Sequence, residues 1–244
     1  MTIHDQFRTK ALGLGFAESE VGRWAPRVRL CGVHRDDGEV VGHFGGPLLV
    51  PDQVRDCWLP LVATIACAAI PPGVTDLVLP PDGQLLFFGY PEEDDSGEVL
   101  YVPPGTEVSE RSLHPDAHTC SPYFDEVCDQ FPQGDIRLVP GLSLPFVDET
   151  EMMVEALATD WGSSGRRFLL GGHGTACNGM NPADMAAYSV AGDAASDDHD
   201  WILLAELDVE HPASGGATMF WMIRRHDLVA RRFEQVLFLA DYNP

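Results

Sequence analysis

Lysine is almost missing from this chain, since Lys10 is the only one among 244 residues. A nucleotide-binding P-loop needs a lysine beside its glycines, and Schiff-base enzymes use a lysine as their nucleophile. The sequence excludes the first class and argues strongly against the second.

Long hydrophobic runs are also missing. No stretch approaches the ~20 apolar residues that a membrane-spanning helix requires, so we expect no contact with a membrane. Residues 1–10 are polar and carry both signs of charge, unlike a secretory signal peptide. We therefore expect a cytoplasmic protein.

Positive charge is scarce. Thirty-eight acidic residues oppose fifteen basic ones, which gives a formal net charge of −23. Nucleic acids and anionic lipids are bound through clustered Lys and Arg, so we expect neither as a partner. A basic protein or a cationic ligand fits this charge, whereas the oligomeric state leaves no trace in the sequence.

Paired cysteine motifs are absent. The six cysteines are scattered and form no CxxC pair. In a cytoplasmic protein of this length we expect free thiols, several of them buried.

The pattern of apolar residues predicts an α+β protein, mainly antiparallel sheet with a few peripheral helices. We expect short helices in residues 1–25, a strand hairpin around residues 28–41 with its turn at 36–38, and a helix at 151–159. The apolar run 58–70 leaves strand and helix open. Further strands are predicted at 84–90, 201–209, 217–223 and 236–239, with a helical turn at 226–232 and an irregular segment at 103–142.

An apolar strand followed by an aromatic strand occurs twice. Residues 58–65 precede 83–88, and residues 201–207 precede 216–221, each second strand beginning near glycine. We interpret this as a duplicated hairpin unit, although chance similarity between hydrophobic strands is the alternative. The expected organisation is one domain over 1–244, with N-terminal helices and hairpin in 1–43 and two pseudo-repeated halves in 44–240.

The same residues carry a resemblance to a known family. In chain order they are Phe44-Gly45-Gly46-Pro47, Trp58, 61–65, 80–88, Leu169-Leu170-Gly171, 201–207, 216–223, Asp227-Leu228 and Phe233. This order resembles the YwqG-like family, a bacterial family of unknown function. The family's strand glutamine is replaced by Thr64 and Glu206, and its Gly-Asp-x-Gly turn by residues 213–216, so a site built on those positions would be altered here.

Metal-ligand residues cluster once, at His114, His118 and Cys120. Imidazole and thiolate suit Zn²⁺, and histidines four residues apart share a helical face. Pro115, however, pushes His114 out of helical geometry, so we favour a solvated loop and expect no metal.

His173 lies in Gly171-Gly172-His173-Gly174-Thr175, which is similar to the oxyanion-hole loop of some hydrolases. Those enzymes also need a Gly-x-Ser-x-Gly turn, and the chain has none. We favour a glycine-dependent turn without catalytic function.

His43 and Glu206 are the remaining candidates for catalysis, as a buried pair. A strand carboxylate among apolar neighbours must find a partner or change its pKa. The alternative, which we favour, is that Glu206 points outward from its strand.

Two functions remain. The missing catalytic motif favours a non-enzymatic binding or interaction protein, with an immunity or regulatory role. The alternative is a hydrolase that uses carboxylate or histidine chemistry in a cleft between the two halves. No cofactor motif is present, so we expect no cofactor.

Overall fold

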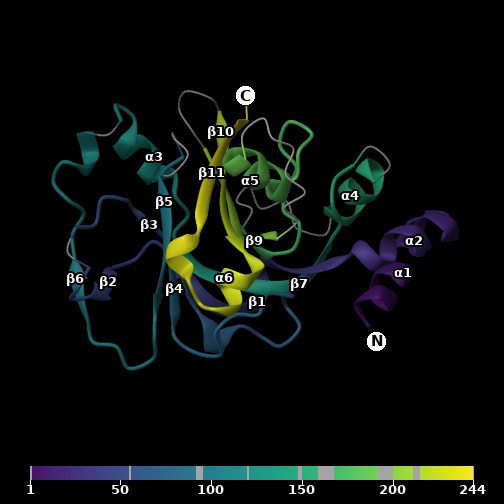
Figure 1. Cartoon of the computed structure of the whole chain (residues 1–244), viewed down its shortest axis with the longest axis horizontal. Helices are drawn as coiled ribbons and strands as arrows, with labels where there is room; N and C mark the ends of the chain where they lie inside the picture. Colours follow the sequence, from purple (N-terminus) through teal and green to yellow (C-terminus); the bar gives the residue numbers. More distant parts are fainter. Residues whose placement is uncertain are drawn as a thin grey trace.

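The computed structural model describes residues 2–54, 56–91, 96–119, 121–147, 150–158, 168–191, 200–210 and 215–243 (Figure 1). Its helices are α1 (Ile3–Gly13), α2 (Glu18–Trp24), α3 (Phe124–Gln130), α4 (Glu151–Ala158), α5 (Pro182–Ala191) and α6 (Arg225–Val229), with single 3₁₀ turns η1 (Ala25–Arg27), η2 (Cys67–Ala69), η3 (Ala117–Thr119) and η5 (Phe233–Gln235). Its strands are β1 (Arg29–Phe44), β2 (Leu48–Pro51), β3 (Leu61–Ala66), β4 (Gln84–Gly89), β5 (Gly97–Val102), β6 (Val108–Arg111), β7 (Gly134–Ser143), β8 (Phe168–Gly171), β9 (Trp201–Val209), β10 (Gly216–Arg224) and β11 (Leu237–Asn243).

Within the described residues, nine strands form one antiparallel sheet in the order β11-β10-β9-β8-β1-β3-β4-β5, with β7 added to β1. The sheet curls until its two ends approach each other. A Cβ on Gly97 of β5 would lie only 2.2 Å from a ring carbon of Phe238 on β11, so glycine allows this close approach. The predicted α+β class, mainly antiparallel with peripheral helices, is confirmed.

The N-terminal helices form a small separate layer. Thr2 caps α1 through a capping box with Asp5, which fixes where the helix begins. Phe7 of α1 packs with Trp24 of α2 and Leu157 of α4 in one hydrophobic cluster. Helices were predicted at each of these places, and Figure 1 shows all three at one end of the molecule.

The predicted hairpin at residues 28–41 is wrong. Residues 29–44 form one long strand, and both parts of it pair with β7, which lies about a hundred residues later in the chain. His34 and Glu39 both face Leu138, so residues 35–38 bulge out. Gly38 lies so close to the β7 backbone that a Cβ would clash at 2.7 Å. The residues that we predicted to form a hairpin turn therefore form a bulge.

The two predicted hairpin units are both present. β3 pairs with β4 and β9 pairs with β10, and each unit continues outward into a third strand, β5 or β11. The aromatic strands of the two units meet inside, where the Phe87 ring stands edge-on to Trp221 at 5.5 Å between centroids. The indole Nε1–H of Trp221 donates to the Phe88 carbonyl at 2.9 Å.

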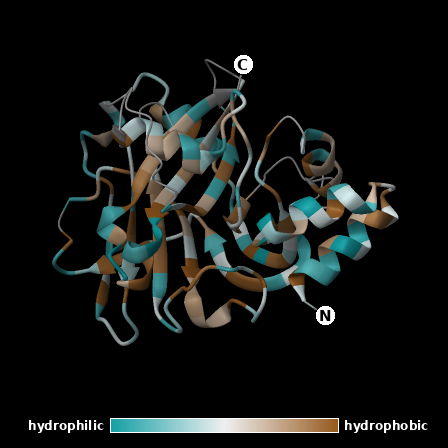
Figure 2. Ribbon diagram, turned by 45° about the vertical axis from the view of Figure 1, so that its right-hand side comes forward, coloured by the Kyte–Doolittle hydropathy of each residue, from teal (hydrophilic) through white to brown (hydrophobic). Residues whose placement is uncertain are grey.

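The second aromatic of each pair faces the other side of the sheet, as the strand period requires. Phe220 lies in a cluster with Ala186 of α5, and Phe88 lies in a cluster with Leu48 of β2. All four aromatic side chains are buried. Figure 2 shows apolar residues concentrated along the strands.

Most other predicted elements form, but the segment 103–142, which we expected to be irregular, contains β6, α3 and β7. The ambiguous run 58–70 becomes β3 followed by η2, and the strands predicted near residues 84, 201, 217 and 236 all form. The turn predicted at 226–232 contains α6. No helix in the described ranges is long and apolar enough to cross a bilayer.

Phe87→Ala should therefore lower the free energy of unfolding by about 3–5 kcal/mol, because it leaves a cavity where the two halves meet. Denaturant unfolding measures the change. Val78→Ala, at a 67% exposed side chain, is the control and should shift stability by less than about 0.5 kcal/mol. Equal effects from both variants would contradict the assigned core.

Candidate functional site

A lobe at one end of the molecule combines negative charge with exposed apolar groups. It consists of the described residues of the segments 48–60 and 104–133, built around the β2–β6 pair and α3, and is called the acidic lobe below (Figure 1). In sequence, the two segments contain eight acidic residues and two arginines. It is tied to the core by Phe88, and by Tyr90 stacked on Phe124 at 5.1 Å.

A cavity of about 560 Å³ opens on this lobe and is called the lobe groove. Apolar side chains and three carboxylates share its walls. It is lined by Gly45, Gly46, Pro47, Leu48, Pro60, Leu61, Glu110, Arg111, Leu113, His118, Phe124, Asp125, Cys128, Asp129, Phe131 and Gln133.

One wall of the lobe groove is the Gly45-Gly46 turn. Both glycines have positive φ, 58° and 91°, which L side chains rarely adopt. The Gln133 amide packs onto Gly45 where a Cβ would clash at 2.6 Å. His43 Nδ1–H donates to the Gly45 carbonyl at 2.9 Å, so this candidate residue holds the turn from behind the groove.

His114 and His118 do not converge. His114 stacks on Trp58 with ring centroids 3.8 Å apart, whereas His118 bonds the Asp125 carboxylate at 2.6 Å. Cys120 lies outside the described residues. Among the residues that are described, no three metal-ligating side chains gather.

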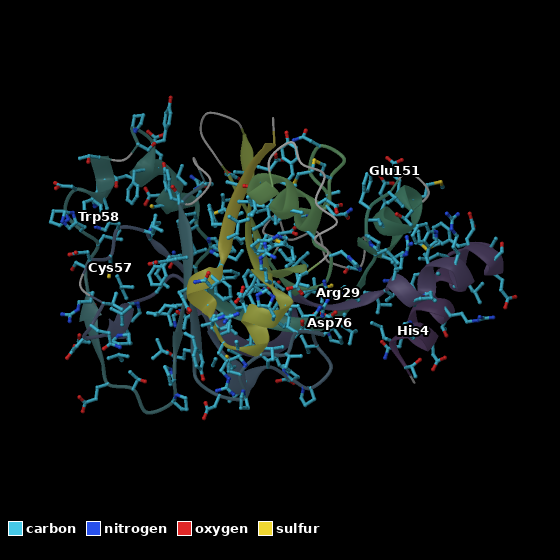
Figure 3. All side chains as sticks on the ribbon, in the orientation of Figure 1. His4, Arg29, Cys57, Trp58, Asp76 and Glu151 are labelled. Carbon is cyan, nitrogen blue, oxygen red and sulfur yellow. The ribbon has the colours of Figure 1, made fainter. Side chains whose placement is uncertain are left out.

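Trp58 is the most conspicuous apolar group of the lobe. Its side chain is 49% exposed, and Figure 3 shows it at the outer end of the molecule. Trp58 lies two residues before Pro60, and its stacking partner His114 directly follows Leu113. Pro60 and Leu113 both line the lobe groove, so Trp58 flanks it. Exposed tryptophans on a rim of this kind are typical of protein-binding surfaces.

A second cavity, of about 540 Å³, lies between the two halves and is called the seam groove. It is lined by Gln53, Val54, Asp56, Cys57, Phe88, Gly97, Glu98, Val99, Leu100, Phe233, Glu234 and Val236. Partial burial alone raises the pKa of Glu98 above its ordinary value. Histidine is absent from the described lining residues.

Our preferred interpretation of Glu206 as an outward-facing residue is wrong. Glu206 is fully buried, because β9 has the main core on one face and α5 on the other. Its carboxylate accepts hydrogen bonds from the Thr175 backbone N–H at 2.7 Å and hydroxyl at 2.6 Å. It therefore anchors the 171–175 loop, two strands away from β1 and far along the sheet from His43.

His173 holds the other side of that loop. Its ring Nε2–H donates to the Arg27 carbonyl at 2.8 Å, and its backbone N–H donates to the Ser143 hydroxyl. Burial lowers the pKa of His173 to about 4. Gly174 has positive φ, and a Cβ there would lie 2.8 Å from a Glu206 oxygen. Glycine is therefore needed for the loop to pack against Glu206. This supports the predicted structural turn.

Burial makes several of the described thiols less reactive. Cys31, Cys57, Cys67, Cys128 and Cys177 are all free, and Cys120 lies outside the described residues. Burial raises the pKa of Cys31 to about 12 and of Cys67 to about 11. A thiolate is the reactive form of cysteine, so these two thiols are inert at neutral pH.

Residues 50–241 match the family model described as a domain of unknown function, DUF1963. The chain belongs to this family. The match covers nearly all of the acidic lobe, the seam groove and both hairpin units, and it begins after β1. The resemblance to the YwqG-like family remains a prediction, and it is consistent with a family of unknown function. No curated protein matches the chain.

Sequence reasoning missed the lobe groove and its charged residues Arg111, Asp125 and Asp129. They lie in the segment that we expected to be irregular, and the groove forms only when residues 45–48 meet residues 110–133. The excess of acidic residues in that segment was the available indication.

His173 should make stability pH-dependent. Its folded pKa of about 4 lies below the ordinary 6.5, so as pH falls through this window the unfolded chain binds a proton that the folded chain does not. Stability contributed by the neutral ring is present above pH 6.5 and lost toward pH 4. His173→Gln should flatten the free energy of unfolding against pH in this window, and identical slopes would contradict the assignment.

Proposed function

We propose that this chain is a non-enzymatic binding protein that captures a basic protein segment in the lobe groove. The observation that carries the proposal is that apolar side chains and three carboxylates line the same groove. In an immunity or regulatory role, such binding would block or modulate the activity of the partner.

Charge supports this choice of partner. Glu110, Asp125 and Asp129 line the groove, and Asp116 and Glu126 lie in the same acidic lobe. Like-signed charges around a cavity focus the field and raise the local concentration of oppositely charged groups. A segment rich in arginine or lysine therefore gains both faster encounter and favourable pairing.

Apolar contact supports a protein segment over a simple cation. Leu48, Leu113, Phe124 and Phe131 form much of the wall, which can cover the aliphatic stems of basic side chains and apolar neighbours. Trp58 beside the groove adds an aromatic face for a cation. A hydrated inorganic ion would use none of these surfaces.

The hydrolase alternative would use the seam groove, because that cavity lies between the two halves. Three carboxylates line it, Asp56, Glu98 and Glu234, of which Glu98 and Glu234 come from opposite halves. The pKa of Glu98 is raised by burial alone, so no neighbouring carboxylate contributes to the shift as in a coupled acid–base pair. We therefore favour binding.

The charge dependence can be measured with a pool of hexapeptides built from Arg, Lys, Leu and Ser. Peptides retained on the immobilised protein are identified by mass spectrometry, and association rates are measured against ionic strength. Asp125→Asn/Asp129→Asn should lower the association rate by roughly three- to tenfold at low salt. The difference should shrink as salt rises, because exposed charges become screened.

The matched control is Glu151→Gln/Glu155→Gln on α4. It removes the same charge from exposed residues at the opposite end of the molecule, as Figure 3 shows for Glu151. It should leave association close to the unmodified rate. Equal slowing in both variants would mean that only overall charge matters, and absence of any retained peptide would contradict the proposed function.

Trp58→Ala should weaken binding of the best retained peptide by about tenfold or more, since exposed tryptophans often dominate binding energy. Stability should change little, because the side chain is half exposed. Titration and thermal unfolding test the two expectations. Tyr188→Ala, an exposed aromatic on α5, is the control. Unchanged affinity in Trp58→Ala would remove Trp58 from the binding surface.

A further inference from the structure

Arg111 is the exception in the acidic lobe groove. It lies at the end of β6 and is the only lysine or arginine among the described residues that line the cavity. A cation is unexpected in a site for basic ligands, because it would repel them. The presence of Arg111 at this position therefore calls for a specific group on the ligand that pairs with it.

The Arg111 guanidinium is poorly paired. Its Nη2 lies 3.4 Å from Asp52 Oδ1, a long contact to a carboxylate that is 78% exposed. The same Asp52 oxygen already accepts a hydrogen bond from the Ser109 hydroxyl at 2.9 Å. Arg111 Nε is buried and has no hydrogen-bond partner within the described ranges.

Unsatisfied buried donors are rare in native proteins and point to a missing partner. A guanidinium offers five N–H donors in a planar fork, and its preferred partner is a carboxylate or phosphate bound through two oxygens. The side chain of Arg111 is 35% exposed and lines the groove, so part of it is accessible to a ligand there.

The surrounding charges restrict this anion. Glu110, Asp125 and Asp129 would repel a phosphate or a multiply charged anion. A single carboxylate that belongs to a positively charged ligand satisfies both sets of groups. The C-terminus of a basic peptide has this chemistry, and the cavity is larger than one amino acid requires.

We propose that the lobe groove recognises the free C-terminus of its basic partner, with Arg111 paired to the terminal carboxylate and Asp125 and Asp129 to adjacent basic side chains. This rests on the proposed function of the same groove. It adds that the partner's chain must end there, which an internal basic segment would not satisfy.

The test compares the hexapeptide pool as free acids with the same pool carrying C-terminal amides. An amide has one more net positive charge, so attraction by the acidic lobe alone would make the amides bind as tightly or tighter. Recognition of the carboxylate predicts the opposite order, with the free acids tighter by on the order of tenfold.

Variants assign the preference to Arg111. Arg111→Gln should abolish the difference between acid and amide, and Arg111→Lys should reduce it because an ammonium lacks the planar fork. Arg35→Gln, at an arginine on the β1 bulge that pairs with Asp37, should keep the full preference. Thermal unfolding checks that each variant is folded.

Each other result contradicts a defined part. The amides could bind as tightly as the acids while binding still responds to Asp125→Asn/Asp129→Asn. That result would leave the proposed function intact and overturn C-terminal recognition. An acid preference that persists in Arg111→Gln would also overturn it. Free arginine that competes as well as the best peptide would replace a protein terminus with a small ligand. Loss of all binding in the unmodified protein would overturn both proposals.

Discussion

The contact between Phe87 and Trp221 joins the two halves of the sheet. The two rings come from the aromatic strands of the two hairpin units and meet edge-on at 5.5 Å, with Phe238 packed on Trp221 at the same distance. The Trp221 indole also donates to the Phe88 backbone, so an aromatic of one half is bonded to a strand of the other. Closing this contact requires the sheet to curl, and the curl brings β5 against β11.

A curled sheet with aromatics on both faces needs covers on its outside. Helix α5 covers Phe220, and the acidic lobe covers Phe88. The lobe thus shields part of the core, and beside its short β2–β6 pair it also carries a groove. The same segments that shield the core can therefore present charged and aromatic residues to a partner.

Much of the fold was predictable because it depends on local patterns. The capped start of α1, the strands rich in aromatic residues and the turn before β4 are each specified within a few residues. The hairpin at 28–41 failed because pairing with β7 is a long-range contact that no local pattern reveals. Glu206 was misplaced for the same reason, since alternation predicts exposure only where one sheet face is open, and α5 closes that face.

The candidate residues separate into two physical classes once burial is known. Glu206 and His173 hold one glycine-rich loop in place, Glu206 through Thr175 and His173 through the Arg27 carbonyl, so changing them should affect folding. Arg111 makes only a long ion pair within the described structure, and the Trp58 side chain is half exposed. Natural folds rarely leave such groups idle, because unsatisfied donors and exposed aromatics both cost stability or solubility. A ligand that satisfies them would gain binding energy, which is why we propose the acidic lobe as the binding surface.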